Sequence, residues 1–492
     1  MFSRIVIGGL AGDSGKTLVS LALVLAARER GRDVAAFKKG PDYIDAAWLT
    51  WASGRPARNL DTFLMGRDAV AASFERHASA DGVNIIEGNR GLHDGIDADG
   101  THSTAALARL LGAPVLLVVS AAKATRTVAA LVLGCQTLEP DVEIAGVILN
   151  RIGSPRHEAV IREAVASVCG IPVVGSLPRF SPGSLVPGRH LGLVTPSEHA
   201  GLDELRSMLI EQVARRLDVD AILGISRGET TRRTSRAEGR RDPAGKRDTC
   251  PAAVGPASRR STAPASRRPT RATPVGSPDG RDLRIGYLED AAFTFYYPEN
   301  LEALEAAGTT LVPISAVSGG TLPADLHALY IGGGFPETHA VALSRNTVLL
   351  EWIRDRAGAG LPIYAECGGL MLLSRAIIWR GVRYPMAGAL PFDTEVCDTP
   401  QGHGYVEMVV DAPNPFYPAG LTIRGHAFHY SRPLVAGDPP PTSCSVARGT
   451  GCWSNRDGIV VRSVWASYAH VHALGTPAWA AGMIRAARRF AR

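Results

Sequence analysis

Arg4-Ile5-Val6-Ile7-Gly8-Gly9-Leu10-Ala11-Gly12-Asp13-Ser14-Gly15-Lys16-Thr17 is a β-branched apolar run that passes through a glycine-rich turn into a helix-forming segment. Backbone N–H groups in such a turn, together with the helix N-terminus, form a nest for phosphate oxygens. Lys16 would neutralise the β- and γ-phosphates, and the Thr17 hydroxyl would bind Mg²⁺. The stretch therefore predicts a P-loop that holds ATP through Gly12, Asp13, Ser14, Gly15, Lys16 and Thr17. A glycine-rich turn with no ligand is the alternative.

The rest of the chain repeats this alternation of strand and helix patterns. Strands are expected at 5–8, 34–38, 83–87, 115–120 and 144–149, with helices at 17–30 and 102–111. The pattern resumes with a strand at 284–288, a helix at 297–307, strands at 329–331 and 362–365, and a basic terminal helix at 477–492. Continuous apolar strands separated by helices predict parallel sheets covered on both faces. We therefore expect two α/β domains, 1–225 and 283–492, each with a mostly parallel sheet flanked by helices.

The segment between them, 226–282, differs in composition. It holds 14 Lys and Arg against six Asp and Glu, a local charge of +8, so the remainder of the chain sums to −2. With almost no large apolar residues it cannot bury a core, which predicts a long, basic, disordered linker. A nucleic-acid-binding arm is the alternative, but no aromatic residues are interleaved to stack on bases.

Compartment and partners are also constrained by the sequence. Met1 leads almost directly into the first strand, so no signal peptide is expected. The longest apolar stretch, 113–120, is much too short to span a membrane. Seven cysteines, an odd number with no C-x-x-C pair, favour the cytoplasm. We expect neither membrane nor nucleic-acid partners.

Acidic residues gather in glycine-rich loops that follow predicted strands. One group lies in the segment from Lys38 to Asp45, Lys38-Lys39-Gly40-Pro41-Asp42-Tyr43-Ile44-Asp45, and further members are Glu87 and Asp94. Parallel sheets bind ligands at the carboxyl ends of their strands, and Mg²⁺ prefers oxygen ligands. The grouping predicts a metal and phosphate site beside the P-loop. Any one of these residues could instead be a helix cap.

A second chemical motif is Tyr364-Ala365-Glu366-Cys367-Gly368-Gly369, a strand, a sharp turn and a helix that would expose the thiol of Cys367 at a helix N-terminus. The loop around Gly332 to Pro336 could supply N–H groups to an oxyanion hole, and Gly333, Gly334 and Gly368 are the candidates. His470 and His472 are the candidate bases. A zinc site formed by the two histidines and a cysteine is the alternative.

The motifs in combination resemble the cobyrinic acid a,c-diamide synthase family. They are G-P-D-Y-I-D at 40–45, E-G-x-x-G-L-x-D-G at 87–95, G-V-I-L-N-R at 146–151, and D-x-x-F-x-F-Y-Y at 290–297. The P-loop, lengthened by one residue, is similar to that of dethiobiotin synthetases, and the second half is similar to class I glutamine amidotransferases of the cobyrinate type. Two places depart from the family pattern, the neighbourhood of Trp48 and the pair Asn89-Arg90.

The resemblance implies a role for each candidate residue. Thr17, Asp42 and Glu87 would hold Mg²⁺, and Lys38 and Asn150 would join the P-loop in binding ATP. Tyr43, Asp45 and Asp94 would position the substrate carboxylate or the ammonia. Cys367 and His470 would hydrolyse glutamine. Other class I domains place a Glu two residues after that histidine, but His472 stands there, so the third member of the triad is unassigned.

The implied reaction is phosphorylation by ATP of the a and c carboxylates of a corrin-type macrocycle, followed by displacement of phosphate by ammonia from glutamine. A homodimer is a possible assembly. The enzyme alternatives are nickel-sirohydrochlorin a,c-diamide synthesis and amidation of the cobyric acid synthase type. A partition-type nucleotide switch is the non-enzyme alternative, but Ala11 stands where such proteins carry a second P-loop lysine.

Overall fold

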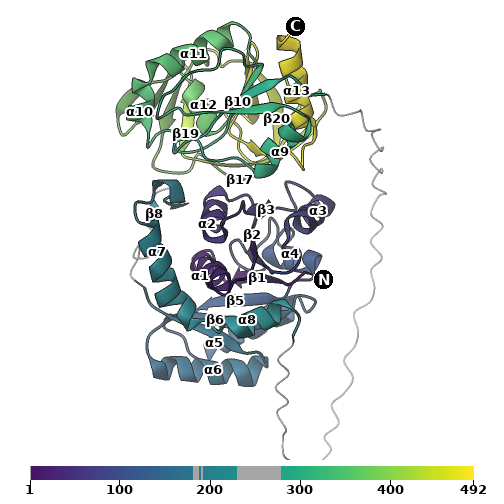
Figure 1. The fold of residues 1–492 in the computed structure, drawn as a ribbon, viewed down its shortest axis with the longest axis vertical. Coiled ribbons are helices and arrows are strands. Elements are labelled where there is room, and N and C mark those ends of the chain that lie inside the picture. Colours follow the sequence, from purple (N-terminus) through teal and green to yellow (C-terminus); the bar gives the residue numbers. More distant parts are fainter. Residues whose placement is uncertain (1, 181–187, 190–191, 230–278) are drawn as a thin grey trace, which may run out of the picture. The chain divides into compact units, whose positions relative to one another are not determined.

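Seven strands form the sheet of the first half in the computed structural model, which describes residues 2–180, 188–189, 192–229 and 279–492 (Figure 1). The sheet order is β3-β2-β4-β1-β5-β6-β7, and every pair of neighbours is parallel. The strands are β1 (Arg4–Gly9), β2 (Val34–Lys39), β3 (Arg58–Leu60), β4 (Val83–Glu87), β5 (Val115–Ser120), β6 (Ile144–Ile152) and β7 (Val173–Pro178). The predicted parallel α/β fold is confirmed for this half, and β3 and β7 are additions at the two edges.

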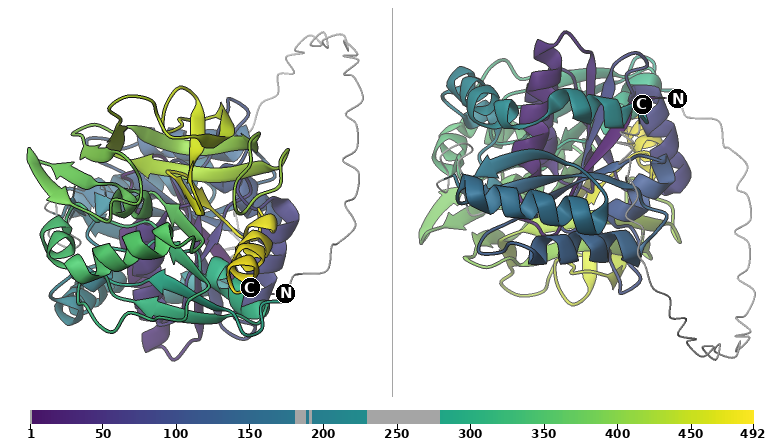
Figure 2. Two further views of the ribbon diagram at one scale, coloured as in Figure 1. Left: turned by 90° about the horizontal axis from the view of Figure 1, so that it is seen from above. Right: turned by 90° about the horizontal axis from the view of Figure 1, so that it is seen from below.

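Helices cover both faces of this sheet because successive side chains of a strand point to opposite sides. On β1, Ile5 and Ile7 join one core cluster and Val6 joins the other. The first face is covered by α1 (Lys16–Glu29), α2 (Tyr43–Ser53), α7 (Leu202–Met208), a π-helical turn (Leu209–Val213) and α8 (Val219–Ser226). The second is covered by α3 (Arg67–His77), α4 (Thr104–Leu111), α5 (Thr127–Leu138) and α6 (Pro155–Cys169). Figure 2 shows α5 and α6 side by side.

The helix expected at 102–111 begins two residues later than predicted. His102 has a φ of 60°, outside the helical region, and the Ser103 hydroxyl accepts a hydrogen bond from the Ala106 N–H. Ser103 is therefore the N-cap of α4, as serine commonly is.

The second half is built around a ten-stranded sheet, with the order β11-β10-β12-β13-β22-β21-β20-β17-β18-β23. Its strands are β10 (Arg284–Leu288), β11 (Thr310–Ile314), β12 (Ala328–Ile331), β13 (Ile363–Glu366), β17 (Gly402–Val410), β18 (Thr422–His429), β20 (Thr442–Arg448), β21 (Arg456–Val461), β22 (Val464–Ser467) and β23 (His470–Val471). Pairs from β11 to β22 are parallel, and those from β22 to β23 are antiparallel. The expectation of a mostly parallel sheet is thus refined to a mixed one in this half.

Helices again pack on both faces, together with a small sheet. Tyr330 and Tyr364 face the cluster that includes α9 (Pro298–Ala306) and α13 (Ala478–Phe490), whereas Ile331 and Ala365 face α11 (Thr347–Gly358) and α12 (Gly368–Leu373). The second half also contains α10 (Ala340–Arg345) and a four-stranded sheet of β14 (Ala376–Trp379), β15 (Val382–Pro385), β16 (Asp393–Val396) and β19 (Ser431–Leu434). The short pair β8 (Gly188–Arg189) and β9 (Gly192–Leu193) belongs to the first half.

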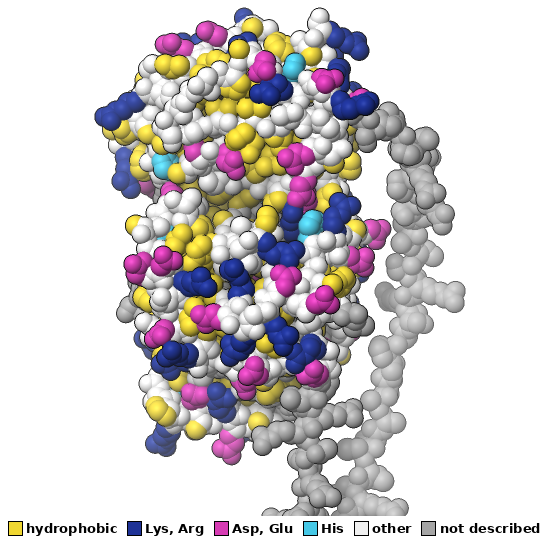
Figure 3. Space-filling model, in the orientation of Figure 1, with side chains coloured by type: hydrophobic (Ala, Val, Ile, Leu, Met, Phe, Trp, Pro, Cys, Tyr) yellow, Lys and Arg dark blue, Asp and Glu magenta, His cyan; other side chains and the backbone are white. Residues whose placement is uncertain are grey.

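The division of the chain into units and the charges on its surface can be compared with the sequence-based expectations. The two sheets belong to one unit of the chain, 1–229 with 278–492, whereas most of the segment predicted as a basic linker, 230–278, lies outside the described residues. Figure 3 shows basic and acidic side chains intermixed on the face in view. In the part of the chain that the structure describes, no helix combines the length and the apolar character needed to cross a membrane.

Candidate active site

The P-loop is closed on itself by hydrogen bonds. The Ser14 hydroxyl donates to the Ala11 carbonyl (3.0 Å), and Lys16 Nζ donates to the carbonyls of Ala11 (2.8 Å) and Gly12 (3.2 Å). Lys16 is buried, and its pKa is lowered to about 8, first by desolvation and then by the nearby Lys38. The Lys16 ammonium group donates to loop carbonyls here, and it could donate to phosphate oxygens instead when ATP is bound.

Behind the P-loop lies a buried group of opposite charges. Lys38 Nζ contacts Asp45 Oδ2 (2.5 Å) and Glu87 Oε1 (2.9 Å), and Thr17 Oγ1 donates to Glu87 Oε1 (2.7 Å). Strands β2 and β4 are neighbours, with Lys38 opposite Glu87 in register, which is why residues 49 positions apart meet. The structure thus brings together four predicted residues, Thr17, Lys38, Asp45 and Glu87.

Burial perturbs the protonation of this group. Burial raises the pKa of Glu87 to about 7, and Lys38 acts in the opposite direction. Burial would lower the pKa of Lys38, but Asp45 and Glu87 outweigh it and raise that pKa. Titratable groups perturbed by both desolvation and partner charges are typical of functional sites.

The residues present fit a magnesium ion. Glu87 Oε2 is buried and has no hydrogen-bond partner among the described residues, although a carboxylate oxygen in that position needs one. The other oxygen of the same carboxylate, Glu87 Oε1, accepts a hydrogen bond from Thr17. A P-loop hydroxyl together with an acidic side chain is a common set of Mg²⁺ ligands. Asp42 lies nearby but commits Oδ1 to the Asp45 N–H (2.8 Å), as the N-cap of α2.

The remaining predicted residues of this half occupy three places. Asn150 Nδ2 donates to the Ser14 carbonyl (2.9 Å), so it lies against the P-loop itself. The side chain of Asp13 is exposed and pairs with Arg151 (3.3 Å). Asp94 Oδ2 accepts from the Gly91 N–H (2.8 Å) and lines a large cavity.

Cys367 sits on a strained turn directly after β13. Its φ of 47° and ψ of −99° lie outside the regions that non-glycine residues normally adopt, at a cost of about 1–3 kcal/mol. The N–H of Cys367 donates to the Ser467 carbonyl at the end of the adjacent β22 (2.8 Å). Strand, elbow and helix α12 follow one another as the sequence predicts, and α12 has only six residues.

His470 reaches Cys367 because β22 lies beside β13 and the chain needs only two further residues to arrive at β23. The ring is buried. Burial by itself would lower its pKa, but the neighbouring Cys367 and Glu366 outweigh it and raise the pKa of His470 to about 9. Tyr43, predicted to serve substrate positioning, packs against this ring from the first half, with 5.1 Å between ring centroids.

The glycines proposed for an oxyanion hole lie around the same thiol. A side chain on Gly333 would collide with the His470 ring, and a Cβ on Gly368 would lie 3.0 Å from the Gly334 backbone nitrogen. Gly334 and Cys367 both line a small pocket of about 40 Å³. Glycine is therefore needed here to let the backbone and the imidazole approach.

His472 is directed elsewhere. Its Nδ1 accepts from the Leu474 N–H (3.2 Å), and its Nε2 lies 3.6 Å from Glu299 Oε2. Among the described residues, no group of three or more His, Cys, Asp or Glu side chains is arranged to hold a metal ion, so the zinc alternative has no geometric support.

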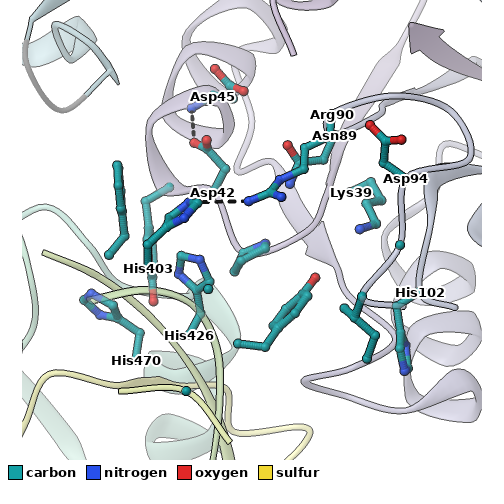
Figure 4. Close-up of a pocket in the computed structure, with 18 of the residues that line it drawn as sticks. Lys39, Asp42, Asp45, Asn89, Arg90, Asp94, His102, His403, His426 and His470 are labelled. Carbon is teal, nitrogen blue, oxygen red and sulfur yellow. Dashed lines mark hydrogen bonds between the residues drawn. The ribbon is translucent and has the colours of Figure 1, made fainter. Parts of the chain in front are cut away.

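A cavity of about 700 Å³ is lined by residues that lie near both chemical centres, and Figure 4 shows the side chains that line it. Asp42, Asp45 and Asp94 line it from the first half, and His470 lines it from the second. Three apolar side chains line this cavity and also the small pocket at Cys367: Ile44, Phe295 and Phe428. We call these three the shared wall.

Several lining residues were missed by the sequence analysis. They are mostly basic or histidine side chains: Lys39, Arg90, His102, His403, His426 and Arg448. Arg90 approaches His403 (3.5 Å), a contact visible in Figure 4. The only signal in the sequence was the unusual Asn89-Arg90 pair, because strands β17, β18 and β20 reach the cavity only through tertiary folding.

Comparison with known proteins agrees with both centres. Residues 5–193 match the CobQ/CobB/MinD/ParA nucleotide binding domain, and residues 284–478 match the CobB/CobQ-like glutamine amidotransferase domain. The chain is 42% identical over 482 residues to a cobyrinate a,c-diamide synthase of Magnetococcus marinus, covering 98% of this chain and 96% of the relative. This chain belongs to the cobyrinate a,c-diamide synthase family. The family resemblance seen in the sequence is thereby confirmed.

Two further relatives show the range of the family. A cobyrinate a,c-diamide synthase of Syntrophotalea carbinolica is 41% identical, covering 96% of both chains. A hydrogenobyrinate a,c-diamide synthase of Streptomyces coelicolor is 38% identical, covering 96% of this chain and 95% of the relative. Members of similar identity to this chain therefore carry the names of two different macrocycles.

Proposed function

We propose that this protein converts the a and c carboxylates of a corrin-type macrocycle into amides, using ATP and glutamine. The observation that carries the proposal is the large cavity, which runs from the acidic residues near the P-loop to His470 beside the cysteine elbow. A carboxylate placed there would meet an activating phosphate at one end and a source of ammonia at the other.

In the first half-reaction the substrate carboxylate attacks the γ-phosphorus of ATP, and ADP leaves. Lys16 and Lys38 neutralise the charge of the transferring phosphoryl group, an effect that is strongest in the transition state. Mg²⁺, held by Thr17 and Glu87 with Asp42 nearby, would neutralise further phosphate charge. The acyl phosphate that forms has a good leaving group, which the carboxylate lacks.

In the second half-reaction Cys367 attacks the side-chain carboxamide of glutamine. The backbone N–H groups near Gly334 and Gly368 would stabilise the oxyanion, and His470 would give the departing nitrogen its proton. Water then hydrolyses the thioester to glutamate. The ammonia attacks the acyl phosphate, and inorganic phosphate leaves as the amide forms.

We infer that ammonia crosses the shared wall of Ile44, Phe295 and Phe428. These are the side chains that border both the small pocket and the large cavity. Apolar surroundings favour neutral ammonia over ammonium because desolvation penalises the charged form. The nucleophile would thus arrive unprotonated.

The lining of the cavity suits a substrate with many carboxylates. Lys39, Arg90 and Arg448 supply cationic groups, and guanidinium groups bind carboxylates bidentately. The relative named for hydrogenobyrinate favours a second candidate, in which the macrocycle carries no cobalt. Nickel-sirohydrochlorin and the macrocycles amidated by cobyric acid synthases are two further candidate substrates.

The test is incubation of the protein with ATP, Mg²⁺, glutamine and each macrocycle in turn, followed by mass spectrometry. We expect a loss of about 1 Da per amidation and a diamide end product. Oxygen-18 placed in the substrate carboxylate should appear in phosphate. Release of AMP carrying the label would instead indicate adenylation, and absence of amide with every macrocycle would contradict the proposed function.

Three further expectations belong to the proposal. Residues 1–225 and 283–492 serve as the synthetase and amidotransferase domains. The protein works in the cytoplasm, and a homodimer is its candidate assembly.

A further inference from the structure

One charged residue of the amidotransferase half has no role in the sequence analysis, although it directly precedes the nucleophile. Glu366 is the last residue of β13, and its side chain is fully buried beneath the elbow. Carboxylates are almost never fully buried unless they are paired. The groups that contact this carboxylate therefore indicate its role.

Each oxygen of Glu366 faces a polar group. Oε1 accepts from the Val471 N–H (3.1 Å), and Oε2 accepts from the Tyr330 hydroxyl (3.3 Å). Oε2 also lies 3.4 Å from His470 Nδ1. Two of these three contacts are therefore to residues 470 and 471, so the carboxylate is fixed relative to the segment that carries the imidazole.

Among the described residues, Glu366 is the polar group that faces His470 Nδ1. That atom is buried and has no closer polar partner in the described chain. Cys367 is the second group that interacts with this ring. Contacts of this kind are often long without substrate and shorten when it binds.

The usual position for an orienting glutamate is filled by a residue that serves another contact. His472 approaches Glu299 (3.6 Å), which in turn approaches Arg58 of the first half (3.8 Å). His472 therefore faces Glu299 and does not occupy the orienting role.

We propose that Glu366 is the positioning residue that completes a Cys367–His470–Glu366 triad. Its carboxylate holds the Nδ1–H tautomer of His470 and stabilises the imidazolium that forms when Cys367 loses its proton. The inference rests on the proposed glutamine hydrolysis, and it places the third group before the nucleophile instead of after the base.

The test compares Glu366→Gln with the full-length wild type in three assays. Hydrolysis of glutamine should fall by about 10²–10⁴-fold in kcat, as when the orienting carboxylate of a serine protease triad becomes an amide. The KM for glutamine should change little, and macrocycle amidation from ammonium chloride should stay near the wild-type rate. Asp457→Asn, which alters another buried carboxylate of the same sheet, is the matched control and should preserve hydrolysis.

A pH profile separates positioning from a merely structural role. The rate at which iodoacetamide alkylates Cys367 reports the thiolate. Without the carboxylate the imidazolium is less stable and the thiolate loses its counter-charge, so the midpoint of alkylation should move to higher pH. Glu366→Asp keeps the charge but shortens the side chain, so its midpoint should lie between those of wild type and Glu366→Gln.

The outcomes are distinct. Wild-type protein without any glutaminase activity would contradict the proposed function itself. Normal hydrolysis by Glu366→Gln, or lost hydrolysis with an unchanged alkylation midpoint, would overturn the assignment of Glu366. If Glu366→Gln does not fold, an unchanged midpoint in Glu366→Asp would overturn it equally.

Discussion

The two proposed half-reactions depend on different residues: Lys16 serves phosphorylation of the carboxylate and Cys367 serves hydrolysis of glutamine. Lys16 lies in the P-loop against the carbonyls of Ala11 and Gly12, whereas Cys367 stands at the elbow after β13. Neither side chain contacts the other, so each half-reaction should be removable by itself. Two substitutions test this separation.

Cys367→Ser should abolish glutamine-dependent amidation and leave amidation from ammonium salts largely intact, because only the source of ammonia is removed. Both activities are measured by mass spectrometry of the macrocycle. Cys135→Ser, at a half-buried cysteine of α5, is the control and should retain both activities. Loss of both activities in Cys367→Ser would mean that the thiol also supports the synthetase site or the fold.

Lys16→Ala should lower amidation by orders of magnitude with either nitrogen source, because the charge that meets the β- and γ-phosphates is lost where it matters most. Basal glutamine hydrolysis, followed as glutamate release, should survive. Lys123→Ala changes an exposed lysine of the same half and should have little effect. Amidation at the wild-type rate in Lys16→Ala would be incompatible with phosphoryl transfer at this P-loop.

His429 should make stability depend on pH. Burial lowers the pKa of His429 from 6.5 to about 4. Between these two pH values the imidazole is protonated in the unfolded chain but neutral in the folded protein. The free energy of unfolding should therefore fall as pH drops from about 6.5 towards 4. Urea unfolding at pH 7.5 and pH 5 should show that His429→Gln loses about 2 kcal/mol less than wild type over this interval. Equal losses would show that another group, such as the half-buried His426, governs the loss of stability in acid.

At the scale of elements, the terminal helix is held by an aromatic cluster. Trp479 of α13 is fully buried, and its ring lies 5.1 Å from Tyr330 and 5.8 Å from Tyr364, centroid to centroid. Tyr330 also donates to Glu366, the proposed positioning residue. The terminal helix predicted at 477–492 thus packs, through Trp479, against the tyrosine that contacts Glu366.

Trp479→Ala should lower the free energy of unfolding by about 3–5 kcal/mol, the range for large-to-small changes in a packed core. Chemical denaturation checks the value. Trp379→Ala, at a half-buried tryptophan of β14, is the matched control and should cost clearly less. Equal effects of the two substitutions would mean that α13 contributes little to the core.

At the scale of the whole molecule, the two chemical centres meet across a few side chains. Tyr43 stacks on Phe295 with 5.0 Å between centroids and also contacts the His470 ring. The Arg58 guanidinium donates a hydrogen bond to the Glu302 carboxylate (2.6 Å), and the Tyr405 hydroxyl donates one to the Asp61 carboxylate (2.6 Å). The start of α2, which supplies Asp42 and Asp45 to the synthetase site, therefore also packs on the glutaminase site.

Phe428→Ala should open the shared wall and let ammonia escape. We expect the ratio of glutamine hydrolysed to amide formed to rise several-fold. With unlabelled glutamine and low [¹⁵N]ammonium in the buffer, the variant's product should gain ¹⁵N, whereas wild-type product should stay largely unlabelled. Val382→Ala, at an exposed valine of the same half, should behave as wild type. Identical labelling of wild type and Phe428→Ala would argue against a passage at this wall.

The sequence by itself determined the features that are written in contiguous residues. The P-loop, the cysteine elbow and the acidic loop at Asp42 each need only a strand, a turn and the start of a helix, so local pattern and residue chemistry suffice to predict them. The motifs in combination also identified the resemblance to the cobyrinic acid a,c-diamide synthase family. Regular α/β alternation predicted the parallel sheet of the first half.

Only the tertiary structure decided which distant groups share a site. His470 meets Glu366 instead of a residue two positions along, because β22 and β23 bring it over the end of β13. Arg90, His426 and Arg448 line one cavity although they lie on separate elements. Burial, partner charge and strand order arise from packing of the whole chain, and one-dimensional spacing does not encode them.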